Sequence, residues 1–272
     1  RAAAAGNPKP VLVQVFLRQG MDGLTTVVPY GDGELYNLRP TLAIQPPGPP
    51  NGARDLDGFF GLAPAAAPLL TPFNNGHLAV VHASGSPDPT RSHFVSFERM
   101  EFADPTLPYS ALGMGWAARY LVETAAGVTS PLRAIGVSNV LPYTLRQGPK
   151  ALPVANFADF RFPGLALTSA QRQAAIVDTY ARRHPLIAAP ALDTMTAFGL
   201  GGVDFAGYVP ANGAQYASTG FGARMRHIAA LIKGHTGVEI ISIDVGGWDL
   251  HANLGPLNGQ MASLLDQLTR GL

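Results

Sequence analysis

The sequence predicts an α/β protein with a mostly parallel central sheet, and two observations lead to this prediction. Short apolar runs rich in β-branched residues recur at residues 10–17, 78–83 and 238–245, and this is the composition of strands buried on both faces. Each run also ends abruptly in glycine and polar residues. Since ligands bind at the carboxyl ends of the strands in open α/β sheets, we expect these three strand ends to share one site.

The composition narrows the class of protein. The chain has 272 residues, a net charge of +1 and only 14% charged residues, which suits one large α/β domain or two small ones. It has no basic block and no apolar run of membrane-spanning length, so we expect no nucleic-acid partner and no membrane span. Because cysteine is absent, any metal must be held by His, Asp, Glu or hydroxyl groups.

The chain opens on residues 1–9, whose alanine-rich start (RAAAAG) is typical of a tail left after removal of an export signal. An engineered scar is the alternative. The first strand follows at residues 10–17, and its apolar character predicts a central, parallel position. It runs into a glycine-flanked carboxylate, Asp22, which is either a metal ligand at the sheet edge or the N-cap of a turn.

The second strand, residues 78–83, leads into a helix. Asp88 followed by Pro89 is the pattern of an N-cap and a first helical residue. The sequence therefore predicts a helix that begins at this pair and ends near Phe102.

Two hydroxyl groups, those of Thr90 and Ser92, would then lie in the first turn of this helix, where free N–H groups favour an anion. Between them, Arg91 offers a guanidinium fork suited to phosphate or sulfate. Beside a metal ion, such a hydroxyl is a candidate nucleophile for phosphoryl or sulfuryl transfer. The alternative is that both hydroxyls only cap the helix.

The third strand, residues 238–245, ends in Gly246 and Gly247, and these are followed by Trp248, Asp249 and His251. An Asp-x-His triplet on a loop can aim a carboxylate oxygen and an imidazole nitrogen at one divalent ion. In the alternative interpretation the carboxylate caps a helix or turn and the imidazole bonds to the backbone.

The remaining segments fit the same architecture. Strands are expected at residues 131–138 and 151–157, and helices at 169–184, 221–233 and 260–270. Residues 104–220 are rich in loops, and we interpret them as an insertion or cap region.

Four motifs, FLRQGMDGLTTVVPYGD, LDGFFGLAP, LAVVHASGSPDPTRSHF and GGWDLHAN, resemble the exported bacterial family known as domain of unknown function 1501. That family is related to sulfatases and the alkaline phosphatase superfamily. The resemblance implies a single alkaline-phosphatase-like α/β domain over residues 10–272, with helices on both faces of the sheet. It also implies a periplasmic or secreted protein. The chain matches about two thirds of the family's length, so the sheet is expected to be incomplete at the C-terminus or completed by a second chain.

The resemblance further implies a metal-dependent hydrolase or transferase that acts on phosphate or sulfate esters. The expected ligands of a divalent ion (zinc, magnesium, manganese or calcium) are Asp22, Asp249 and His251. The expected catalytic group comprises Ser92 or Thr90 as nucleophile, with Arg91 and His93. The alternative is a non-catalytic exported scaffold or assembly subunit, because Val95 and Phe97 replace polar residues of the family.

Overall fold

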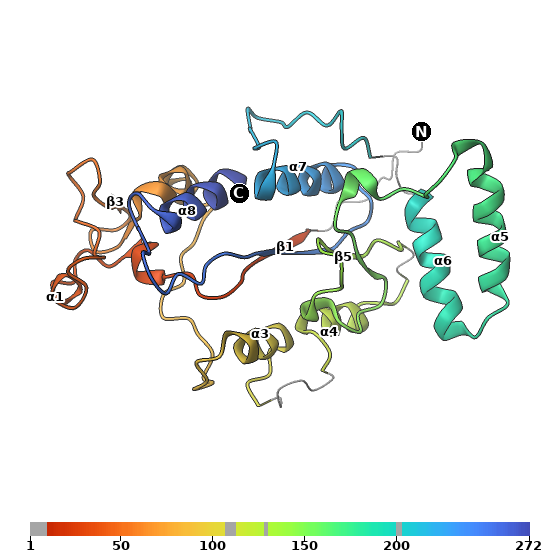
Figure 1. Cartoon of the computed structure of the whole chain (residues 1–272), viewed down its shortest axis with the longest axis horizontal. Helices are drawn as coiled ribbons and strands as arrows, with labels where there is room; N and C mark the ends of the chain where they lie inside the picture. Colours follow the sequence, from red (N-terminus) through yellow and green to blue (C-terminus); the bar gives the residue numbers. More distant parts are fainter. Residues whose placement is uncertain (1–9, 107–112, 128–129, 200–202) are drawn as a thin grey trace. The chain divides into compact units, whose positions relative to one another are not determined.

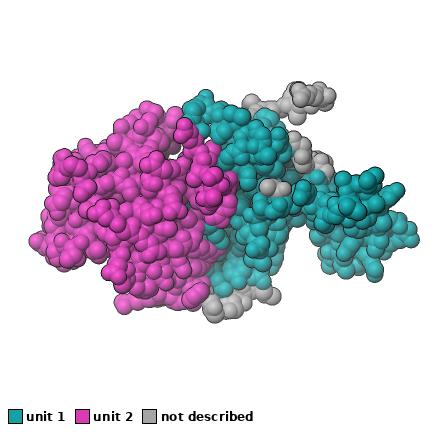
Figure 2. Space-filling model, turned by 45° about the horizontal axis from the view of Figure 1, so that its top comes forward, with its two compact units in different colours: residues 1–16, 98–214, 226–244 teal, residues 17–97, 215–225, 245–272 magenta. Residues whose placement is uncertain are grey.

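A computed structural model describes residues 10–106, 113–127, 130–199 and 203–272. The chain divides into two compact units, distinguished by colour in Figure 2. The first unit comprises residues 1–16, 98–214 and 226–244, and the second comprises residues 17–97, 215–225 and 245–272. The chain passes between the units several times. The single domain expected over residues 10–272 stays a prediction, and the tail at residues 1–9 lies outside the described residues.

The first unit contains a four-stranded sheet of order β1-β7-β5-β6. Its strands are β1 (Leu12–Leu17), β5 (Ala134–Gly136), β6 (Ala151–Pro153) and β7 (Ile240–Val245). Strand β5 pairs parallel with both β6 and β7. The bonds from Leu12 N to Glu239 O and from Arg18 N to Val245 O advance in the same direction along β1 and β7, so this pair is parallel too. The predicted α/β class with a parallel sheet is confirmed.

Strand β1 lies at an edge of this sheet, and the prediction of a central position is therefore wrong. Its residues are partly exposed rather than buried, although its apolar, β-branched composition is typical of a strand covered on both faces. The composition of a strand does not indicate whether it has a neighbouring strand on one side or on both. The buried run Ile240–Val245 (β7) takes the place between β1 and β5.

The described residues also form α-helices. They are α1 (Glu34–Leu38), α2 (Leu70–Asn74), α3 (His93–Phe102), α4 (Trp116–Glu123), α5 (Ser169–Ala181), α6 (Pro185–Gly199), α7 (Gly220–Lys233) and α8 (Gln260–Gly271). Helices α5, α7 and α8 confirm the predicted ones. Helix α6 was not predicted, and it accommodates Pro190 inside it. Among the described residues no helix has both the length and the apolar character needed to cross a bilayer.

Helices cover both faces of the sheet in the first unit. Ala134 of β5 packs in a buried cluster with Ala117 and Leu121 of α4. The next residue, Ile135, faces a cavity that it shares with Leu231 of α7. Successive strand residues point to opposite faces, so α4 and α7 lie on opposite sides of the sheet, as Figure 1 also shows.

Residues 104–220, interpreted from sequence as an insertion or cap, contribute directly to this sheet. They supply strands β5 and β6 and helices α4, α5 and α6. The first unit therefore draws two of its four strands from this region.

The second unit contains a small antiparallel sheet of order β2-β4-β3. Its strands are β2 (Val27–Val28), β3 (Arg54–Asp55) and β4 (Gly61–Leu62). Helix α8 buries Met261, Leu265 and Leu268, whose spacing of four and three residues forms one apolar stripe. The hydroxyl of Thr269 donates to the carbonyl of Ala65 at 3.2 Å, which fixes α8 against the preceding 3-10 helix at Pro64–Leu69.

The strand predicted at residues 78–83 is wrong, because this segment is irregular and largely exposed. Val81 is 79% exposed. An apolar, β-branched run forms a strand only where partners pair with it and cover a face. The composition of a segment does not indicate whether such a partner strand is present.

The helix predicted to begin at Asp88 begins instead at His93 and ends at Phe102, as expected. Asp88 Oδ1 accepts from the Thr90 N–H at 3.1 Å, and Thr90 Oγ1 accepts from the Ser92 N–H at 3.1 Å. These local bonds give the backbone an alternative to the helix. They hold the segment as two successive turns and delay the start of α3.

Candidate metal centre

The segments that follow β1 and β7 belong to the second unit, and they leave the sheet side by side. The Arg18 N–H donates to the Val245 carbonyl at 2.9 Å, and the Gly247 N–H donates to Gln19 Oε1 at 3.0 Å. Gly247 has a φ of +97°, a left-handed conformation that glycine adopts without strain. The segments after two of the three expected strands therefore lie side by side.

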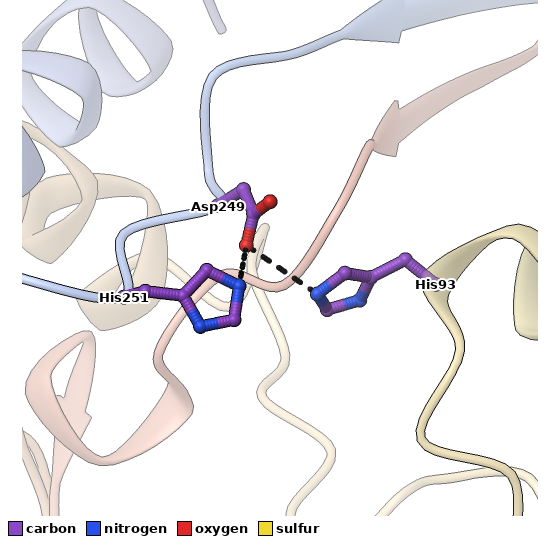
Figure 3. A group of neighbouring side chains, drawn as sticks. All are labelled: His93, Asp249 and His251. Carbon is purple, nitrogen blue, oxygen red and sulfur yellow. Dashed lines mark ion pairs between the residues drawn. The ribbon is translucent and has the colours of Figure 1, made fainter.

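Three side chains of the second unit converge here: His93, Asp249 and His251 (Figure 3). One potential ligand atom from each lies within 4.8 Å of the others. Asp249 Oδ1 is 2.5 Å from His251 Nε2 and 3.4 Å from His93 Nε2. In Figure 3 both imidazoles point to the same carboxylate oxygen. We call these three residues the His–Asp–His cluster.

The loop that carries Asp249 and His251 is anchored by the residue before them. Trp248 is almost completely buried, with only 1% of its surface exposed, whereas Asp249 and His251 are exposed. The indole fixes the start of the loop. The Asp-x-His spacing then brings the carboxylate and the imidazole to the same side.

His93 reaches the cluster from a different element, because it is the first residue of α3. Its ring stacks on Phe97, one turn along the helix, with ring centres 6.2 Å apart and an angle of 20° between the planes. The loop after β1 passes close to it on another side. A Cβ atom added to Gly20 would lie 3.0 Å from His93 Cε1, so the absence of a side chain at Gly20 leaves room for the imidazole.

The structure gives Asp22 a different partner from the one expected. Its carboxylate accepts from Arg39 Nη1 at 2.9 Å and from Arg39 Nη2 at 2.5 Å. It also accepts from the Thr25 N–H at 2.9 Å, as the N-cap of a short 3-10 helix at Gly23–Thr25. Asp22 is not a member of the His–Asp–His cluster. The alternative interpretation, a capping Asp, describes this residue.

These contacts set the pKa of the Asp22 carboxyl. Partial burial acts to raise the pKa, but the hydrogen bonds from Arg39 and Thr25 and the positive charge of Arg39 outweigh it. The pKa of the Asp22 carboxyl therefore lies below its ordinary value of 3.8. The same pairing raises the pKa of the Arg39 guanidinium.

The expected nucleophiles both take part in local capping bonds. Thr90 Oγ1 accepts from the Ser92 N–H, and Ser92 Oγ accepts from the Val95 N–H at 3.5 Å in the first turn of α3. Arg91, between them, is exposed. The cap interpretation thus describes both hydroxyls, and each still lies within three residues of His93 in the chain.

Sequence reasoning found two members of the cluster and gave the third another role. Asp249 and His251 were expected as ligands, whereas His93 was expected in the catalytic group. The Asp-x-His spacing links the first two directly. The signal for His93 was its place in the motif that resembles the exported bacterial family, and no spacing in the sequence connects it to the loop after β7.

The donor atoms of the cluster suit a divalent ion. Zinc binds His nitrogen at about 2.0–2.1 Å and carboxylate oxygen at about 2.0–2.2 Å, so two ligands on a tetrahedral ion are roughly 3.3 Å apart. The 3.4 Å between His93 Nε2 and Asp249 Oδ1 fits this separation. The 2.5 Å contact between His251 and Asp249 must open to accept an ion. Because 79% of the His251 side chain is exposed, a rotation of the imidazole would open this contact.

Comparison of the chain with protein-family models, curated proteins and solved structures finds no match. The class of this protein is therefore described from its fold and its candidate site alone. It is an α/β protein whose first unit contains a four-stranded parallel sheet, and whose second unit carries a His–Asp–His cluster.

Proposed function

We propose that this protein is a metal-dependent hydrolase or transferase acting on phosphate or sulfate esters, as its resemblance to the exported bacterial family implies. The observation that supports this proposal most directly is the convergence of His93, Asp249 and His251 within 4.8 Å. Two imidazoles and one carboxylate are a ligand set found in catalytic zinc sites, where a further position stays open.

In this proposal the cluster holds the ion, and the neighbouring residues bind the ester. A divalent ion would draw negative charge from a phosphoryl or sulfuryl oxygen as a Lewis acid. The exposed guanidinium of Arg91 would bind the same anionic group through a charge-assisted pair. The N-terminus of α3 would favour its negative charge. Ser92 and Thr90 remain the two candidates for the nucleophile.

The proposal is tested by assaying 4-nitrophenyl phosphate and 4-nitrophenyl sulfate with zinc, magnesium, manganese or calcium supplied in turn. Asp249→Asn should abolish turnover and leave the fold intact, because the amide keeps the shape but loses the charge that attracts a cation. Asp266→Asn is the matched control, since its side chain is 44% exposed against 38% for Asp249. Absence of turnover with every ion and both esters would contradict the proposal.

A specific observation favours the alternative, a non-catalytic exported scaffold or assembly subunit. The cluster is open to solvent, with 37% of the His93 side chain, 38% of Asp249 and 79% of His251 exposed. Catalytic electrostatics are strongest where water is excluded. Metal binding without turnover of either ester would support the scaffold. Export to the periplasm or the medium is part of both proposals.

A further inference from the structure

We propose that His93, and not Asp22, completes the metal site with Asp249 and His251, and that the site holds a single ion of the zinc class. This inference rests on the metal dependence of the proposed function. It names the ligands, the number of ions and the kind of metal.

The donor set favours a zinc-like ion over magnesium or calcium. Two of the three converging groups are imidazoles, and imidazole nitrogen suits zinc, copper, nickel and iron. Magnesium and calcium prefer oxygen ligands almost entirely. With His93 in place of Asp22, the set changes from one nitrogen and two carboxylates to two nitrogens and one carboxylate. The preference therefore shifts towards transition metals.

The ion pair with Arg39 keeps the Asp22 carboxylate from binding the metal ion. Both carboxylate oxygens accept from its guanidinium, at 2.9 and 2.5 Å, and a bidentate pair of this kind is among the stronger hydrogen-bonded contacts. To bind an ion, Asp22 would have to break this pair and leave the positive charge of Arg39 beside a divalent cation. The remaining cluster has one carboxylate, which is too little negative charge to hold two divalent ions.

His93 is held in position before any ion arrives. Its ring stacks on Phe97, and the guanidinium carbon of Arg18 lies 5.1 Å from the centre of the same Phe97 ring. On another side the backbone at Gly20 approaches Cε1. A ligand whose orientation is already restricted loses less conformational entropy on binding, so His93 is expected to contribute strongly to affinity.

The experiment measures zinc binding by isothermal titration calorimetry on chelator-treated protein, without substrate. The wild type should bind one zinc per chain. His93→Ala, and the more conservative His93→Gln, should weaken binding by at least about 100-fold, because loss of a ligand exceeds the 10- to 100-fold effect of losing its supporting partner. His251→Ala and Asp249→Asn should do the same.

Two controls should leave affinity within about threefold of the wild type, well below the effects expected for ligands. Asp22→Asn removes the other expected ligand. His82→Ala removes a histidine of the same unit that stacks on Phe60. Circular dichroism and thermal melting without metal establish that each variant is folded at the titration temperature.

The spectrum of bound cobalt(II) reports the ligands independently. His93→Gln should change the visible absorption of the cobalt-loaded protein, and Asp22→Asn should leave it unchanged. The inference is overturned if the wild type binds no zinc or two zinc ions, if His93 variants bind like the wild type, or if Asp22→Asn loses as much affinity as Asp249→Asn. Loss of ester turnover has no bearing on any of these outcomes, so failure of the proposed function can be told apart from failure of this inference.

Discussion

The guanidinium of Arg39 holds the carboxylate of Asp22 through two contacts, Nη1 to Oδ1 at 2.9 Å and Nη2 to Oδ2 at 2.5 Å. Both side chains are about one-fifth exposed, at 21% and 23%. The pair joins the loop after β1 to the residue that follows α1. It therefore ties two segments of the second unit together.

This pair predicts an acid-dependent loss of stability. Because the folded pKa of Asp22 is depressed below 3.8, its stabilising contribution is complete above the unfolded pKa and is lost as the pH falls through the folded pKa. Arg39→Met should lower the free energy of unfolding by about 1–3 kcal/mol at pH 7. It should also flatten the pH dependence below about pH 4.

Urea unfolding between pH 3 and pH 7 checks this prediction. Arg270→Met is the control, since its pair with Asp266 is exposed and such pairs contribute about 1 kcal/mol or less. If Arg39→Met lowers the free energy of unfolding by the same amount at every pH, the acid-dependent loss of stability does not come from Asp22.

A second prediction concerns the close approach of Gly20 to His93. Gly20→Ala would bring a Cβ atom to 3.0 Å from His93 Cε1, so the imidazole must move by a few tenths of an ångström. If His93 is a ligand, zinc affinity should fall about tenfold, the effect of disturbing a ligand's orientation. Gly23→Ala is the matched control, because nothing lies within 4 Å of a Cβ there. Equal affinities for the two variants in calorimetry would count against the proposed role of His93.

A third prediction concerns the buried ion pair of the first unit. Arg133 Nη2 lies 3.1 Å from Glu239 Oε2, and only 1% and 7% of the two side chains are exposed. Arg133 also donates to the carbonyl of Leu121 and the hydroxyl of Thr124. Arg133→Met should destabilise the protein by about 3–5 kcal/mol, because it removes one member of a buried ion pair.

The double variant Arg133→Met with Glu239→Leu separates charge from packing. Replacing both members of a buried pair by apolar residues is often neutral or stabilising, so the double variant should be more stable than Arg133→Met alone. Urea denaturation measures both. A double variant less stable than the single one would contradict this prediction, because it would show that Glu239 stabilises the protein even without Arg133.

A fourth prediction concerns His227 in α7. Its ring lies against Phe157 and Phe205, with ring centres 6.2 and 5.6 Å away. Burial, and then the charge of Arg226, lower the pKa of His227 below 6.5. The unfolded chain therefore binds a proton more readily, and stability should fall as the pH drops from about 6.5 through the lower folded pKa. His227→Gln should reduce this loss.

Melting temperatures between pH 5 and pH 8 test the role of His227. The exposed His77 provides the control, because in His77→Gln the melting temperature should change with pH as it does in the wild type. An unchanged slope in His227→Gln would mean that another group causes the acid sensitivity.

The sequence by itself determined the elements whose signals are local. Apolar runs rich in β-branched residues identified β1 and β7, and an amphipathic pattern identified α7. Glycine and polar residues after the strands marked the two ends that meet, and the spacing of Asp249 and His251 marked two members of the cluster. Each signal arises within a few residues of the chain.

Only the tertiary structure decided which segments pair and which side chains meet. Residues 78–83 have a strand's composition but no strand's structure, and β1 lies at an edge. Asp22 pairs with Arg39, 17 residues away, and His93 joins a loop from the other end of the chain. Which segments pair depends on competition between distant partners for the same strand edge or the same carboxylate. The free energy of each contact depends on both partners, so it cannot be predicted from the local sequence around either one.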